Sequence, residues 1–277
     1  MTPAQATRHR ERAGWDNPAI ARYYERFCAR HGRYQEANAA LVREADLKPG
    51  QRVLDLGAGT GRTAEAALPF LGPQGTIVCV EPSSPMRVVG KARLPDDRVR
   101  WSPDCRGETV AFDRILCGAS IWQMTPLDRT FQWLANLLSP GGALCFNIPS
   151  LYLGEPDEPG GGRDPLLLEL AGLLSRGHHA AAAGTPLPDA DQIARRLSRA
   201  GLQPRRWTFR VRLTQAAYRD WLKLPVVTDW MLGGVDADDR ARQIDEAFSR
   251  IDRESWRWER WTGWTAQAAR QEGSDDL

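Results

Sequence analysis

The sequence predicts an α/β fold with a doubly wound, mostly parallel sheet that is covered by helices on both sides. Two observations support this prediction. Up to about residue 148, short apolar runs alternate with segments of helical spacing, and two longer alternating segments follow near the end of the chain. Runs that are apolar on both faces are typical of parallel strands buried between helices. The 277 residues suffice for one large domain, or for one domain with a sizeable insertion.

The individual elements follow from these periodicities. Strands are expected at 52–56, 76–80, 98–101, 112–117, 143–147, 203–213 and 256–264. Helices are expected at 18–34, 36–45, 62–71, 84–92, 126–138, 166–174, 189–200, 214–232 and 237–252. The last strand alternates like the strand before it, so we expect these two to pair antiparallel. The prediction is a seven-stranded sheet with an antiparallel last strand.

Composition excludes several classes of protein. The formal net charge of +2 gives no electrostatic reason to expect a nucleic-acid partner. No apolar stretch approaches the roughly 18 residues of a membrane span, and the polar N-terminus lacks the apolar centre of a signal peptide. The five cysteines are scattered without a C-x-x-C pair, which indicates a reduced, cytoplasmic protein. No His, Asp or Glu cluster has metal-ligand spacing, so no metal is expected.

A glycine turn follows the first predicted strand and leads directly into a helix. Glycines let a backbone approach a ligand closely, and the helix N-terminus offers unpaired N–H groups. The G-x-G-x-G spacing differs from the dinucleotide fingerprint G-x-G-x-x-G, which disfavours a nucleotide-dependent oxidoreductase. Glu81 ends the next strand at a suitable distance to hold a ribose diol. The turn itself consists of Gly57, Ala58, Gly59, Thr60 and Gly61.

Residues 53–61 resemble the first motif of the class I S-adenosylmethionine-dependent methyltransferases. Further stretches agree in order and spacing over about residues 18–148. They are Lys48-Pro49-Gly50 before the first strand, Glu81-Pro82 after the second, Phe112-Asp113 at the fourth and Leu138-Ser139-Pro140-Gly141-Gly142 before the fifth. The resemblance implies a Rossmann-like sheet and S-adenosyl-L-methionine as the cofactor.

The resemblance also implies roles for residues around the turn. Asp55 and the backbone of residues 57–61 would face the methionine part of the cofactor. Glu81 would bind the ribose hydroxyls, and Pro82 and Met86 would flank the adenine.

Two later segments would complete the cofactor site. Asp104-Cys105 resembles the Asp-Ala pair of the family, so Asp104 would accept from the adenine amine. The segment from Cys117 and Gly118 to Ser120 would line the cofactor, and Trp122 would stand near the sulfonium.

The candidates for closing the site and for catalysis come from outside these motifs. Tyr23 or Tyr24 matches a family tyrosine that closes over the methionine end, with core packing as the alternative. A base is needed only if the acceptor must lose a proton. His31, after the tyrosine helix, and His178, in the later insertion, are the candidates, with a surface position as the alternative for His178.

These implications suggest a division of the chain. We expect a cap or lid helix at 1–35, the cofactor-binding core at 36–148 and a substrate-covering insertion at 149–187. Residues 188–277 would complete the core and carry a helical cap insertion at 214–252.

The acceptor is predicted only as a class. Eleven tryptophans could form a pocket for a flat or cationic molecule, or could simply pack in the core. Residues 147–150 resemble the Asn-Pro-Pro-aromatic signature of enzymes that methylate planar amines, but they follow the wrong strand and lack the second proline. We therefore expect a small, apolar or aromatic acceptor, as in secondary metabolism, and neither nucleic acid nor membrane. A homologue that binds S-adenosylmethionine without transferring methyl is the alternative, and a homodimer is left open.

Overall fold

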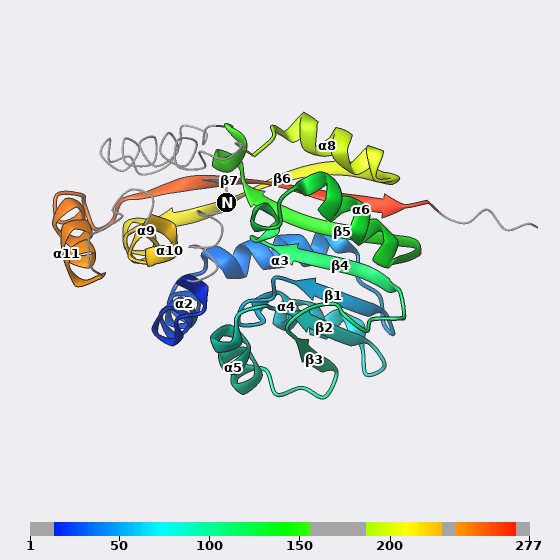
Figure 1. Cartoon of the computed structure of the whole chain (residues 1–277). Helices are drawn as coiled ribbons and strands as arrows, with labels where there is room; N and C mark the ends of the chain where they lie inside the picture. Colours follow the sequence, from blue (N-terminus) through cyan, green and yellow to red (C-terminus); the bar gives the residue numbers. More distant parts are fainter. Residues whose placement is uncertain (1–13, 156–186, 229–236, 270–277) are drawn as a thin grey trace, which may run out of the picture.

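The computed structural model describes residues 14–155, 187–228 and 237–269. Its centre is a seven-stranded sheet of order β3-β2-β1-β4-β5-β7-β6 (Figure 1). β1 to β5 are parallel, and β7 pairs antiparallel with both β5 and β6, which confirms the predicted fold class. The strands are β1 Arg52–Leu56, β2 Thr76–Val80, β3 Val99–Ser102, β4 Phe112–Gly118, β5 Leu138–Pro149, β6 Leu202–Thr214 and β7 Trp256–Ala268.

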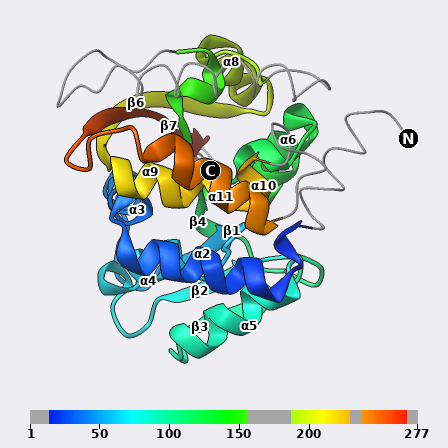
Figure 2. The same ribbon diagram turned by 90° about the vertical axis from the view of Figure 1, so that its left-hand side faces the viewer.

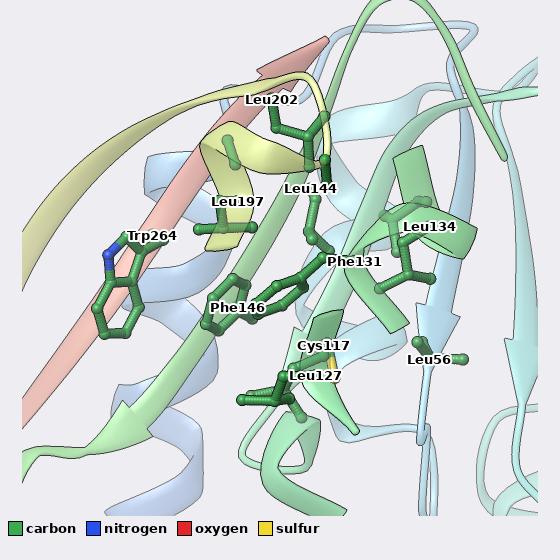
Figure 3. Packing of buried hydrophobic residues seen from close by; sticks show 14 of the residues in the cluster. Leu56, Cys117, Leu127, Phe131, Leu134, Leu144, Phe146, Leu197, Leu202 and Trp264 are labelled. Carbon is green, nitrogen blue, oxygen red and sulfur yellow. The ribbon is translucent and has the colours of Figure 1, made fainter. Parts of the chain in front are cut away.

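Helices cover both faces of the sheet. One face packs on α3 and α4, and the other on α6 and α8. Figure 3 shows the second contact, where Phe131 of α6 stacks on Phe146 of β5, and Phe146 stacks in turn on Trp264 of β7. The helices are α2 Pro18–Arg30, α3 Arg33–Ala45, α4 Arg62–Leu71, α5 Ser84–Arg93, α6 Leu127–Leu137, α8 Ala190–Arg199, α9 Gln215–Leu222, α10 Pro225–Thr228 and α11 Ala237–Phe248, with short 3-10 turns η1 Ile121–Gln123 and η2 Ser150–Leu153.

The structure differs from the predicted boundaries in several places, among them the end of β7, which runs to Ala268, and the end of α11, which stops at Phe248. The helix expected over 18–34 ends at Arg30, because His31 is extended (φ −123°, ψ 132°), and α3 begins after Gly32. β5 is longer than expected because β7 pairs with it as far as Pro149. The helix expected over 214–232 is divided into α9 and α10 before Pro225. The helix expected over 166–174 lies outside the described residues.

Four helices gather at one edge of the sheet. β6 runs parallel to β5, because each pairs antiparallel with β7, so the carboxyl ends of β1, β2, β4, β5 and β6 share an edge. Figure 2 looks onto this edge and shows α2, α9, α10 and α11 lying across it. In doubly wound sheets, ligands bind outside the carboxyl ends of the strands where the strand order reverses. Here that point lies between β1 and β4.

Candidate functional site

The glycine loop joins β1 to α4 at this point of reversal. All three glycines have positive φ angles, +70° at Gly57, +56° at Gly59 and +80° at Gly61. A Cβ at Gly57 would meet Ser120 Oγ at 2.6 Å, and one at Gly61 would meet the Trp101 ring at 3.0 Å, so protein contacts explain both glycines. A Cβ at Gly59 would have one near neighbour among the described residues, Tyr24 Cε1 at 3.8 Å. The space beside Gly59 is therefore bounded, among the described residues, only by the Tyr24 ring at contact distance, and we refer to it below as the open space at Gly59.

Asp55, on β1 before the loop, is fully buried, and among the described residues only one of its two carboxylate oxygens has a hydrogen-bond partner. Its Oδ2 accepts a hydrogen bond from Ala64 N at 3.1 Å, whereas its Oδ1 has no hydrogen-bond partner within the described part of the chain. Burial raises the pKa of Asp55 to about 7, although the bond from Ala64 lowers it. A buried charge without a partner is costly, so an unpaired carboxylate oxygen suits a cationic group such as an ammonium.

Glu81, at the end of β2, is held by backbone amides on both sides. Its Oε2 accepts from Gly59 N at 2.9 Å and its Oε1 accepts from Ser83 N at 2.8 Å. Burial raises the pKa of Glu81, while these two bonds lower it; the net shift is upward. Each oxygen can still accept a further hydrogen bond, which matches the two donors of a ribose diol. Pro82 is exposed beside it, and Met86 is buried on α5.

The residues expected at the adenine edge follow β3. The Asp104 carboxylate accepts from Arg106 N at 2.8 Å and pairs with Arg106 Nε at 3.3 Å, so its own turn orients it. Cys105 is half-buried and packs against the core between the sheet and α6. Burial raises the pKa of the Cys105 thiol to about 11, so the thiol is neutral at physiological pH.

Cys117 and Gly118 end β4 and make close protein contacts. Cys117 is fully buried, with Sγ 3.0 Å from Ser120 Oγ. A Cβ at Gly118 would meet side chains of α3 and α4 at under 3 Å, so Gly118 permits their close approach. Ser120, the last residue of the predicted lining segment, donates to Leu56 O at 3.2 Å and lies against Gly57. It ties the turn after β4 to the glycine loop.

Of the two candidate tyrosines, the structure places Tyr24 at the loop. Its ring borders Gly59 and lies 5.5 Å from the Trp15 ring and 5.7 Å from the Tyr34 ring. The Tyr23 hydroxyl instead donates to Asp220 O at 2.9 Å, in α9.

Glu25, the residue after Tyr24, fastens α2 to the glycine loop. It accepts from Thr60 Oγ1 at 2.7 Å and forms an ion pair with Arg62. A second tie joins Ser83 Oγ to the carbonyl of Trp15 at 2.8 Å. The sequence carries no signal for Glu25 beyond its position next to a candidate tyrosine.

The catalytic candidates lie at different places on the carboxyl edge. His31 Nε2 lies 2.9 Å from Asp220 Oδ2, and its ring is directed toward α9. Trp122, in η1 after β4, makes an edge-to-face contact with Tyr152 in η2 after β5, with centroids 5.0 Å apart. His178 lies outside the described residues.

Asn147 is fully committed to internal hydrogen bonds. Its amide accepts from Ala119 N and donates to Ala37 O, both at 2.9 Å, and the side chain is completely buried. The described residues contain no cluster of His, Cys, Asp or Glu that could hold a metal ion. A search of the same residues reveals no helix that is both long and apolar enough to cross a bilayer.

The sheet order and the glycine loop define a Rossmann-like protein, and the carboxyl ends of β1 and β2 form its candidate cofactor site. Residues 24–206 match the family model described as "Methyltransferase domain", and the chain belongs to this family. The chain is thus a member of the class I, Rossmann-like family of S-adenosylmethionine-dependent methyltransferases. The open space at Gly59, the unpaired Asp55 oxygen and the fixed Glu81 carboxylate fit the backbone contact, ammonium and ribose diol that S-adenosylmethionine presents.

Individual proteins share part of the sequence or the fold. The chain is 30% identical over 119 residues to the ubiquinone/menaquinone biosynthesis C-methyltransferase of Bordetella parapertussis, covering 41% of this chain and 46% of that protein. The chain thus spans just under half the length of the curated relatives it matches. A solved cyclopropane-fatty-acyl-phospholipid synthase-like protein from Lactobacillus casei shares the fold at TM-score 0.58 and 16% identity, covering 84% and 90% of the two chains. The [4+2]-cyclase SpnF shares it at TM-score 0.50 and 20% identity, covering 84% and 80%.

Proposed function

We propose that this protein transfers the methyl group of S-adenosylmethionine to a small, flat, largely apolar organic acceptor, as in natural-product biosynthesis. The observation that carries the proposal is the set of three features at the glycine loop: the room beside Gly59, the Glu81 carboxylate bound to Gly59 N, and the unpaired buried oxygen of Asp55 on β1. A protein that used the glycine loop only as a turn would have no need of the unpaired Asp55 oxygen. The methyltransferase family supports the reaction type, and the geometry around the glycine loop supports its location.

In this proposal, the residues of the chain bind the cofactor and orient it toward the acceptor. Asp55 Oδ1 holds the ammonium group, and Glu81 accepts from the two ribose hydroxyls. The cofactor supplies a methyl group on a sulfonium, from which the acceptor atom takes the methyl carbon as the carbon–sulfur bond breaks. Tyr24, fastened through the neighbouring Glu25, covers the loop and excludes water. Alignment and exclusion of water are the main contributions that a protein makes to such a displacement.

The acceptor side is lined by aromatic rings. Trp122 and Tyr152 follow β4 and β5, and Tyr24 and Tyr34 come from α2 and α3 across the same edge. Aromatic rings present large apolar faces with few polar groups, which favours flat, apolar molecules. The α2 helix and the helices between β6 and β7 form the proposed cap. The five cysteines are all unpaired, which supports a cytoplasmic location.

The second candidate is a protein that binds S-adenosylmethionine without transferring its methyl group. The cyclase SpnF supports it, because this fold carries a different chemistry there.

A methyl-transfer assay distinguishes the methyltransferase from the protein that only binds S-adenosylmethionine. The protein is incubated with S-adenosylmethionine carrying a deuterated methyl group and with a panel of phenols, naphthols and quinols. We expect S-adenosylhomocysteine to accumulate together with a trideuteromethyl product, detected by mass spectrometry. Gly59→Arg is the matched control, and it should give neither. Tight cofactor binding without product, over acceptors of every atom type, would favour the second candidate.

A further inference from the structure

The guanidinium of Arg33, at the start of α3, is buried among aromatic rings. Arg33 is 2% exposed, and its Cζ lies 4.8 Å from the ring centroid of Tyr34, 4.6 Å from that of Trp221 and 5.1 Å from that of Trp261. We call these four residues the Arg33 cage. The rings are themselves fixed, because Trp221 Nε1 donates to the Tyr34 hydroxyl at 3.3 Å.

The charge of Arg33 is balanced by Glu259 on β7. Arg33 Nε donates to Glu259 Oε2 and Nη2 donates to Oε1, both at 2.8 Å, and Trp261 Nε1 also donates to Oε2 at 2.9 Å. Burial lowers the pKa of Arg33, but the facing carboxylate raises it above its ordinary value. Burial raises the pKa of Glu259, but Arg33 lowers it, and the net shift is downward. Both side chains are therefore charged at neutral pH.

One nitrogen of Arg33 remains without a hydrogen-bond acceptor. Nη1 is buried and has no hydrogen-bond partner within residues 14–155, 187–228 and 237–269. Nε and Nη2 form one edge of the planar guanidinium, so their fork with Glu259 directs Nη1 away from that carboxylate. Ring faces attract the cation, but they are weaker acceptors than oxygen. Buried donors in native proteins are nearly always hydrogen-bonded, so we expect Nη1 to have a hydrogen-bond acceptor when the protein binds its substrate.

The Arg33 cage borders the proposed acceptor side. Trp261 pairs with Pro149 at the end of β5, and Glu259 lies two residues farther out along β7. The Tyr34 ring contacts the Tyr24 ring, which borders Gly59. Tyr152, the partner of Trp122, lies close enough to affect the pKa of Arg33. The free nitrogen thus belongs to the same carboxyl edge as the glycine loop.

We propose that Arg33 Nη1 binds a neutral oxygen of the acceptor, a carbonyl or hydroxyl group on a flat apolar framework. This inference rests on the proposed function and narrows its substrate class. Glu259 already balances the guanidinium, so Nη1 offers hydrogen bonds rather than free charge. A carboxylate bound there would be a second anion near Glu259, and like charges at short range disfavour each other. Arg33 is only 2% exposed, so a neutral acceptor oxygen that reaches Nη1 leaves water behind. In that environment it forms a strong hydrogen bond with the charged guanidinium.

Three naphthalene probes test this choice with the protein saturated by S-adenosylhomocysteine. 2-Acetylnaphthalene carries a neutral carbonyl, 2-isopropenylnaphthalene replaces its C=O by C=CH2, and 2-naphthoate carries a carboxylate. Dissociation constants come from quenching of tryptophan fluorescence. We expect the ketone to bind about tenfold more tightly than the alkene, the effect of one hydrogen bond from a charged donor. The naphthoate should bind no better than the alkene. Equal affinity of ketone and alkene, or preference for the naphthoate, would overturn the inference.

The variant Arg33→Lys assigns the effect to this side chain. Lysine keeps the charge opposite Glu259 but removes the planar fork, so ketone affinity should fall to that of the alkene while alkene affinity stays the same. The matched control is Arg205→Lys, because the Arg205 side chain forms an ion pair with Glu44 but is 59% exposed. A ketone preference that persists in folded Arg33→Lys would contradict the inference, and if this variant fails to fold, the comparison of probes on the unaltered protein decides. If the unaltered protein does not bind S-adenosylhomocysteine, this result would instead contradict the proposed function.

Discussion

Asp55 and Glu259 are both buried carboxylates in the same sheet, but their surroundings are opposite. Glu259 faces a bidentate guanidinium and an indole N–H, and its pKa is lowered. Asp55 has one amide partner and a free oxygen, and burial raises its pKa to about 7. The paired acid stabilises the fold, whereas the unpaired acid destabilises it until a cation arrives. The two sites therefore offer opposite groups to a ligand: an acceptor oxygen of Asp55, and a donor nitrogen of Arg33 in its pair with Glu259.

The largest expected effect follows from removing the paired acid. Glu259→Gln should lower the free energy of unfolding by about 3–5 kcal/mol, because it leaves the Arg33 guanidinium buried without a counter-charge. Chemical denaturation at pH 7.5 measures the change. Glu65→Gln, which breaks a half-exposed ion pair with Arg93, is the control and should change stability by less than about 1 kcal/mol. Similar effects of the two substitutions would show that the Arg33–Glu259 pair is not a stabilising element.

The next effect concerns the open space at the loop. Gly59→Arg should weaken S-adenosylhomocysteine binding at least about a hundredfold, because the side chain fills the space that Gly59 leaves open and the residue must adopt φ +56°. Circular dichroism checks that the variant folds. A folded Gly59→Arg protein with unchanged affinity would mean that the cofactor lies elsewhere.

Titration with pH separates the two acids more finely. Asp55 binds a proton more tightly in the folded protein, so stability should fall as pH rises from the ordinary aspartate pKa to about 7, and should stay level above. Glu259 should act in the opposite sense, with stability lost as pH falls below the ordinary glutamate pKa. Below pH 7, affinity for S-adenosylhomocysteine should fall by up to about tenfold per pH unit, as its ammonium group loses a charged partner. Asp55→Asn should bind weakly with a flat profile; an unchanged profile would remove Asp55 from the site.

The smallest effect compares adjacent tyrosines. Tyr24→Leu should weaken S-adenosylhomocysteine binding by about three- to tenfold, the value of one aromatic contact. Tyr23→Leu removes a bond to α9 and should leave affinity unchanged. Equal losses in the two variants would indicate that α2 acts as a whole, without a specific role for the Tyr24 ring.

The sequence predicted the cofactor half of the molecule more closely than the acceptor half. The predicted bounds of β1, β2 and α4 agree with the structure, because apolar runs, glycines and helix signals lie within a few residues of one another. Asp55 was predicted from the family resemblance and Glu81 from its position after the second strand, and both remain candidates for the cofactor site. The Arg33–Glu259 pair joins residues 226 positions apart, and Glu25 reaches Thr60 across 35, so no local pattern indicates either contact. The break between the first two helices was predicted at residue 35, whereas α2 ends at Arg30 and α3 begins at Arg33.

The most direct test is a calorimetric titration of the purified protein with S-adenosylmethionine, S-adenosylhomocysteine and NAD. We expect micromolar binding of both sulfur compounds and no heat with NAD. Below pH 7, binding of the sulfur compounds should release a proton from Asp55, and this release should disappear in Asp55→Asn. Binding of NAD, or the absence of binding by both sulfur compounds in a folded sample, would contradict the assignment of the glycine loop and its two acids as the cofactor site.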